Sequence, residues 1–103
     1  MNNFGYVYLL CDGDKFKIGM TRRHDITKRI AELQTGNSDT IWLNNYYETT
    51  HPFLVEKMMH TRYANSNVKN EWFNLTPSQV VNFKNECHEC EKIIQALNDN
   101  PFI

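Results

Sequence analysis

A chain of 103 residues with 41% hydrophobic, 22% charged and 13% aromatic residues has the composition of one globular domain, and this excludes an intrinsically disordered chain. The net charge of −1 excludes a globally basic nucleic-acid-binding protein. We expect an intracellular protein of a reducing compartment (cytoplasm or nucleus) without membrane contact, because the three cysteines are an odd number, no apolar run approaches the roughly 20 residues of a membrane span, and the N-terminus lacks an export signal.

The first third of the chain predicts a β-hairpin followed by a helix. Residues 4–11 are aromatic and β-branched, an Asp-Gly pair follows them as a strong signal for a two-residue turn, and residues 15–20 alternate as the second strand. Asp25 is suited to cap a helix, and Gly36 stands where the glycine after a helix belongs.

The rest of the chain predicts one more strand and two more helices. Residues 40–48 indicate a third strand, residues 52–63 a helix, and residues 64–70 a polar loop before a short extended segment. Thr76 begins a capping box with proline at the first helical position, so the last helix is expected to run from there to about residue 98. This order predicts an α+β fold, with a small antiparallel three-stranded sheet flanked by helices and an extra C-terminal helix.

The two-residue turn fixes which side chains stand together on the hairpin. It places Tyr8 opposite Lys17 on the face away from the apolar face, which carries Val7, Leu9, Cys11, Phe16 and Ile18. An ammonium group beside a phenol lowers the pKa of the phenol, which is one way to turn a tyrosine into a base. The alternative, favoured from the hairpin alone, is a cross-strand pair on a solvated face, and a slip in the turn would separate the two groups.

Three polar side chains occupy informative positions on the predicted helices. Arg29 lies next to the apolar positions of the first helix and therefore leans towards the sheet. Glu56 and His60 are four residues apart on the second helix and share a face, either as functional groups or as a surface pair that stabilises the helix.

A cluster of basic residues opens the same region. It contains Lys15, Lys17, Arg22, Arg23, Lys28 and Arg29 together with His24, and only Asp25 opposes them. Such a cluster is either a phosphate-binding patch on a neutral protein or a solvated charged surface.

Taken in order, these residues resemble the GIY-YIG nucleases, in the compact branch found in phage and large-virus reading frames. Tyr6-Val7-Tyr8 and Lys17-Ile18-Gly19 are similar to the two motifs that open that domain, Arg29 to its helical arginine and Glu56 to its glutamate. The resemblance covers residues 4–75.

The chain also departs from the family pattern. Tyr6 stands where the first motif has glycine, and Lys17 where the second has tyrosine. Asn74 is the nearest candidate for the late asparagine of the family.

The resemblance implies a catalytic domain over residues 1–75, with the C-terminal helix of residues 76–103 packed on it. It also implies a DNA endonuclease or nickase that hydrolyses phosphodiester bonds with Mg²⁺ or Mn²⁺, inside the host cell if the source is a virus or phage. A hard divalent cation prefers carboxylate oxygen, which fits a single glutamate as its protein ligand.

Each site residue then has an implied role. Tyr8 is the general base, Lys17 keeps Tyr8 deprotonated and also contacts the phosphate, and Arg29 stabilises charge in the transition state. Glu56 ligates the metal, and His60 either orients a group at the metal or is a structural histidine. The residues expected to grip DNA are Tyr6, Lys15, Arg22, Arg23 and Lys28.

DNA, including structured or nicked DNA, is the expected partner, and specificity is expected to need a homodimer, a separate DNA-targeting partner or the chain's own loops. Because the glycine of the first motif is missing, a non-cleaving nucleic-acid-binding module remains an alternative function. Because the apolar residues of the last helix have a heptad-like spacing, a protein that interacts with partners through this helix is a further alternative. Cys87 and Cys90 fall on the apolar stripe of that helix, so they are expected in the core rather than in a zinc site.

Overall fold

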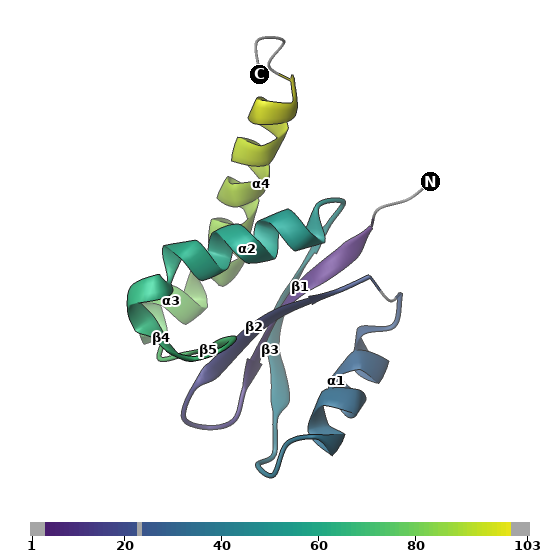
Figure 1. The fold of residues 1–103 in the computed structure, drawn as a ribbon, viewed down its shortest axis with the longest axis vertical. Coiled ribbons are helices and arrows are strands. Elements are labelled where there is room, and N and C mark those ends of the chain that lie inside the picture. Colours follow the sequence, from purple (N-terminus) through teal and green to yellow (C-terminus); the bar gives the residue numbers. More distant parts are fainter. Residues whose placement is uncertain (1–3, 23, 100–103) are drawn as a thin grey trace.

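An antiparallel sheet of five strands, in the order β3-β1-β2-β5-β4, forms the middle layer of an α+β fold (Figure 1). The structure is a computed structural model that describes residues 4–22 and 24–99. In chain order the elements are β1 (Gly5–Cys11), β2 (Phe16–Thr21), α1 (Ile26–Thr35), β3 (Trp42–Thr49), α2 (Pro52–Arg62), the 3₁₀ turn η1 (Ala64–Ser66), β4 (Asn67–Lys69), β5 (Trp72–Phe73), α3 (Pro77–Val81) and α4 (Phe83–Asp99).

The α+β class is confirmed, but the sheet has five strands instead of the expected three, because the short strands β4 and β5 add to it. β4 lies in the segment expected to be a polar loop, whereas β5 lies in the segment expected to be extended; the two form a hairpin, and β5 pairs with the start of β2. β4 has only three residues, all of them exposed, which is too short a run to show the alternation that is typical of a strand. Asn70, at the turn of this hairpin, has a φ of 54°, a left-handed conformation that asparagine tolerates better than most residues.

Four residues, rather than two, connect β1 to β2. The Asp12 Oδ1 atom accepts hydrogen bonds from the backbone N–H groups of Asp14 at 2.9 Å and Lys15 at 2.8 Å. The Asp12 N–H donates to the Lys15 carbonyl at 3.2 Å, and Gly13 has a φ of 96° that favours glycine. The aspartate side chain therefore closes a longer turn than the Asp-Gly pair alone predicts.

This longer turn shifts the predicted register by two residues. Tyr8 pairs with Gly19, and Lys17 pairs with Leu10. Because the shift is even, each side chain keeps its predicted face. The expected placement of Lys17 directly opposite Tyr8 is nevertheless wrong.

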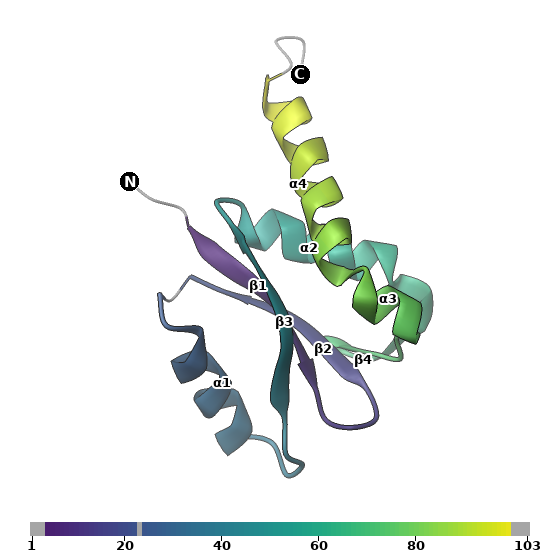
Figure 2. The same ribbon diagram turned by 180° about the vertical axis from the view of Figure 1, so that it is seen from behind.

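The two faces of the sheet carry separate apolar clusters. On one face, β1 and β2 pack against α2 and α4, with buried residues Val7, Leu9, Ile18, Val55, Met59, Tyr63, Phe73, Leu75, Phe83, Cys87, Cys90 and Ile94. On the other face α1 covers Tyr8, Leu10 and Ile41. In both ribbon views α1 lies across the strands from α2 and α4 (Figures 1 and 2). The burial of Cys87 and Cys90 confirms that both cysteines belong to the apolar stripe.

The last helix is divided into α3 and α4 at Asn82. The predicted capping box is confirmed, since the Thr76 hydroxyl accepts from the Gln79 N–H and the Gln79 side chain accepts from the Thr76 N–H. The spacing of apolar residues continues across the break, so it predicted one helix. Within residues 4–22 and 24–99, no helix has the length and apolar character that a membrane crossing needs.

Candidate active site

The candidate site lies along the edge of β2 that β5 leaves uncovered. β5 pairs with Phe16 and Lys17, and the Ile18 N–H donates to the Glu71 carbonyl at 3.1 Å. The next backbone group, the Ile18 carbonyl, is bonded by a helix instead of a strand: it accepts a hydrogen bond from Nε2 of His60 on α2 at 2.8 Å. Figure 1 shows α1 and α2 on opposite sides of this stretch of β2.

Tyr8 reaches the site by lying directly over Gly19. The Tyr8 side chain is buried, and a Cβ atom added at Gly19 would lie 2.7 Å from its Cε1 atom and closer still to its hydroxyl group. Any side chain at position 19 would therefore displace the ring. The glycine of the Lys-Ile-Gly motif is explained by this contact, which carries the phenol across the neighbouring strand.

Arg29 is the cation that contacts the phenol. Burial raises the pKa of Tyr8, the hydrogen bond and charge of the Arg29 guanidinium oppose that rise, and the carboxylates of Glu71 and Glu56 add to it. The outcome is a pKa above the ordinary value, so Tyr8 is protonated at neutral pH. The position of Arg29 at the edge of the apolar stripe is confirmed, whereas Lys17 is not the group beside the phenol.

Glu56, His60 and Glu71 form a cluster of three donors. One potential ligand atom from each lies within 4.8 Å of the others, and all three side chains are half-buried. Burial raises the pKa of Glu56, as does Glu71, while His60 and Lys17 oppose the rise. The shared face predicted for Glu56 and His60 is confirmed, because both enter this cluster.

Glu71 is the residue that sequence reasoning missed. It precedes β5, and only the pairing of β5 with β2 brings it to Glu56, which lies 15 positions earlier in the chain. A prediction of the short β4–β5 hairpin would have placed it beside Ile18. The polar, exposed sequence of β4 gave too weak a signal for that.

Lys17 and Lys15 flank the ring of Trp72. Their Nζ atoms lie 5.8 Å and 5.2 Å from the ring centre, which is cation–π geometry. Lys15 also pairs with Asp12 at 2.7 Å. Beside this group is a pocket of about 190 Å³ lined by Lys17, Glu32, Leu33, Gly36, Asn37, Ile41 and Trp72. Of the predicted catalytic residues, only Lys17 lines it.

The other residues expected to bind DNA are spread over the molecule. Tyr6 packs edge-on against Phe4 and Tyr46, with ring centres 5.0 Å and 5.5 Å away. Arg22 follows β2 at the end opposite Lys15, and Lys28 is exposed on α1. Arg23 lies outside the described residues. The described members of the basic cluster therefore do not form one compact patch.

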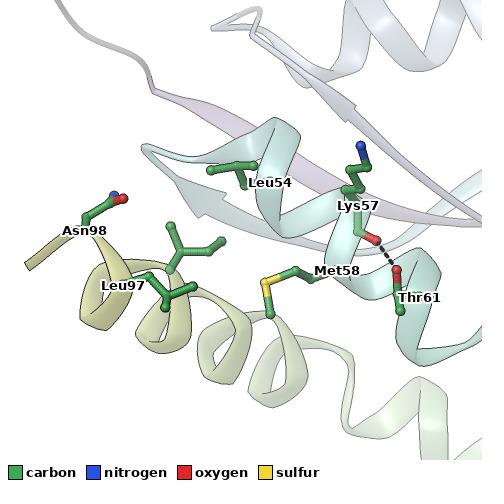
Figure 3. Close-up of a pocket in the computed structure, with 7 residues that line it drawn as sticks. Leu54, Lys57, Met58, Thr61, Leu97 and Asn98 are labelled. Atoms are coloured by element: carbon green, nitrogen blue, oxygen red, sulfur yellow. Dashed lines mark hydrogen bonds between the residues drawn. The ribbon is translucent and has the colours of Figure 1, made fainter. Parts of the chain in front are cut away.

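A second hollow, between α2 and α4, has a different character. It measures about 230 Å³ and is lined by Leu54, Lys57, Met58, Thr61, Ile94, Leu97 and Asn98 (Figure 3). Lys57 is its single charged lining residue, so it lacks the paired proton donors and acceptors that hydrolysis needs.

The edge of β2 therefore combines a phenol, a guanidinium group and a cluster of carboxylates and imidazole. These groups match three chemical tasks, namely proton transfer, binding of an anion and binding of a divalent cation. In comparisons with known proteins, the T5orf172 domain family matches residues 5–97. No curated protein and no solved structure matched the chain.

Proposed function

This chain belongs to the T5orf172 domain family, which is phage-associated and nuclease-related, and from that premise we propose that it is a metal-dependent DNA endonuclease or nickase of the GIY-YIG type. The observation that carries the proposal is the meeting of Tyr8, Arg29 and Glu56 at one edge of β2. They come from β1, α1 and α2, so the fold, and not proximity in the chain, brings them together.

Glu56 is proposed to hold Mg²⁺ or Mn²⁺. The donor set of the cluster fits such an ion, because carboxylate oxygen is the preferred ligand of both metals. When bound, the ion supplies a Lewis acid that stabilises negative charge on the leaving 3′ oxygen of the DNA strand.

Arg29 is proposed to bind the scissile phosphate. Its guanidinium group contacts Tyr8, and its ion pair with Glu32 is long, at 3.6 Å, with both side chains partly exposed. A weak surface pair of this kind leaves N–H groups for phosphate oxygens. Charge that builds up on the phosphorus centre is then stabilised by a cation that is already in place.

Tyr8 is proposed to accept the proton of the attacking water. The phenol must first lose its own proton, and the negative charges of Glu56 and Glu71 both raise its pKa. A divalent cation at the cluster would compensate those charges and so lower the pKa of Tyr8, leaving burial alone to oppose the hydrogen bond and positive charge of Arg29. A cation held by Glu56 would therefore favour the deprotonated form of Tyr8, which is the proposed base.

Lys17 and Trp72 are proposed to hold the DNA beside the scissile phosphate. A lysine contributes a salt-dependent contact to the phosphate backbone, and an exposed part of an indole ring stacks on an unpaired base. This arrangement favours DNA that is nicked or locally unpaired over regular duplex DNA.

The test is nicking of supercoiled plasmid DNA with Mg²⁺ or Mn²⁺, compared between Glu56→Gln and a matched control, Glu48→Gln. Glu48 is exposed on β3, away from the cluster. Glu56→Gln should abolish nicking while the circular dichroism spectrum and DNA binding persist, and Glu48→Gln should nick at the wild-type rate. Undiminished nicking by Glu56→Gln would disprove the role of Glu56. DNA binding without nicking by any variant would favour a non-cleaving module.

A further inference from the structure

We propose that Glu71 is a second carboxylate ligand of the divalent cation, and that Glu56, His60 and Glu71 together form a site that prefers Mn²⁺ to Mg²⁺. This proposal deepens the proposed function and rests on it, since it concerns the cation used in cleavage. Its basis is the cluster at the uncovered edge of β2, where α2 supplies two of the donors and the β4–β5 hairpin supplies the third.

The distances suit a single ion. Ligand atoms on opposite sides of an ion of this size are about 4.2 Å apart, because each metal–oxygen distance is about 2.1 Å. The three donor atoms lie within 4.8 Å of one another without a cation. In an octahedral site at least two of the three donor pairs are adjacent and about 3.0 Å apart, so movement of the donor atoms by about 1–2 Å, through rotation of the glutamate side chains, converts the cluster into a coordination site.

The negative charges of Glu56 and Glu71 also favour a bound cation. Glu56 and Glu71 are both half-buried, and two carboxylates held together repel each other. Among the described residues, neither forms an ion pair with a lysine or arginine, whereas Asp12, Glu32 and Glu86 each do. A divalent cation between them would remove this repulsion.

The backbone of Ile18 positions both neighbouring ligands. Its N–H donates to the Glu71 carbonyl at 3.1 Å, and its carbonyl accepts from His60 Nε2 at 2.8 Å. The second contact requires the proton of the neutral imidazole on Nε2, so the free lone pair is on Nδ1. The His60 ring also packs edge-on against Phe73, with centres 5.0 Å apart. Such hydrogen-bonded and packed imidazoles are typical of metal ligands.

The identity of the donors sets the expected metal preference. Two carboxylates alone suit Mg²⁺ and Mn²⁺ alike, but an imidazole nitrogen favours a transition metal over Mg²⁺. We therefore expect the affinity for Mn²⁺ to exceed that for Mg²⁺ by about tenfold or more. The His60→Asn variant should have a smaller ratio between the two affinities.

The experiment measures Mn²⁺ binding to the full chain by electron paramagnetic resonance of the free ion, with Mg²⁺ as competitor. Glu71→Gln should weaken Mn²⁺ binding about tenfold or more, as should Glu56→Gln, while Glu48→Gln should bind as the wild type does. Circular dichroism establishes that each variant is folded, and Glu71→Asp, which keeps the charge on a shorter side chain, replaces Glu71→Gln if the latter unfolds.

The outcomes separate this proposal from the proposed function. Wild-type Mn²⁺ affinity in folded Glu71→Gln, with loss in Glu56→Gln, would overturn the role of Glu71 and leave the nuclease proposal standing. Loss of Mn²⁺ binding in Glu71→Gln, with no DNA cleavage by the wild type, would support the metal site and overturn the nuclease. Equal affinities of the wild type for Mn²⁺ and Mg²⁺ would overturn the proposal that His60 is a nitrogen ligand of the cation.

Discussion

The two faces of the sheet bury very different numbers of residues, so we call the face under α2 and α4 the deep face and the face under α1 the shallow face. Over the described residues, the face under α2 and α4 buries twelve residues in one cluster, and Tyr47 of β3 ties α4 down further by donating to Glu91 at 2.6 Å. The opposite face buries three residues, and none of the ten residues of α1 is buried. Most of the hydrophobic stabilisation therefore comes from one face.

The face under α1 holds Tyr8, the proposed base. Tyr8 is fully covered, but its hydroxyl group contacts Arg29 on a helix that is otherwise partly exposed. The candidate site thus lies where the two layers meet, with the phenol and the guanidinium group on the α1 side and the carboxylates on the α2 side. Changes on the α1 side should alter catalysis more than stability, and changes on the α4 side should do the reverse.

The largest effect is expected for Tyr8→Phe, which keeps the ring over Gly19 and removes the proton acceptor. The cleavage rate should fall by about 10²- to 10⁴-fold, with little change in the melting temperature. Because burial raises the pKa of Tyr8, so that the phenol is protonated at neutral pH, the wild-type rate should also increase as the pH rises from neutrality.

The control for this variant is Tyr46→Phe, since Tyr46 is an exposed tyrosine on β3. It should cleave at the wild-type rate with the wild-type dependence on pH. A Tyr8→Phe variant that retained that rate and that pH profile would remove Tyr8 from the mechanism.

The next effect tests the deep face. Phe83 is fully buried at the start of α4, so Phe83→Ala should lower the free energy of unfolding by about 3–5 kcal/mol in urea denaturation. Leu97→Ala, at a position that is 51% exposed on the same helix, should lower it by less than about 1 kcal/mol. A similar small loss in both variants would contradict the assignment of stability to this face.

The smallest effect concerns the turn between β1 and β2. Burial raises the pKa of Asp12, but hydrogen bonds from the Lys15 ammonium and from the backbone of Lys15 and Asp14 outweigh it and lower the pKa to about 2, from 3.8. A lowered pKa stabilises the fold above the unfolded value, and that stabilisation of about 2 kcal/mol is lost as the pH falls through about 2.

Asp12→Asn should therefore be less stable than the wild type by about 2 kcal/mol at pH 7, and the two should converge near pH 2. Urea denaturation at both pH values measures the difference, with Asp14→Asn at the exposed neighbouring position as the control. A difference that did not depend on pH would show that the carboxylate charge does not stabilise the turn.

Local chemistry explains what the sequence could predict. Side chains near in sequence define the cap at Asp25, the capping box at Thr76 and the shared helical face of Glu56 and His60, and all three are found in the structure. The alternation along β1 and β2 also predicted the correct faces.

The remaining features depend on contacts that periodicity does not encode. The register depends on hydrogen bonds that the Asp12 carboxylate accepts from the N–H groups of Asp14 and Lys15, and β4 is a run of only three exposed residues. For these reasons the sequence predicts Lys17, rather than Arg29, as the cation beside Tyr8, and it does not predict that Glu71 joins the cluster.

The most direct test of the central claim is the fate of supercoiled DNA incubated with the wild-type protein in Mn²⁺ or in EDTA. Open circles are expected in Mn²⁺ and none in EDTA, and DNA ligase should reseal the nicks, because hydrolysis with a 3′ leaving oxygen produces ligatable ends. Supercoiled DNA that stays intact with Mn²⁺ while bound to the protein would contradict the assignment of the β2 edge as a phosphodiester hydrolase site.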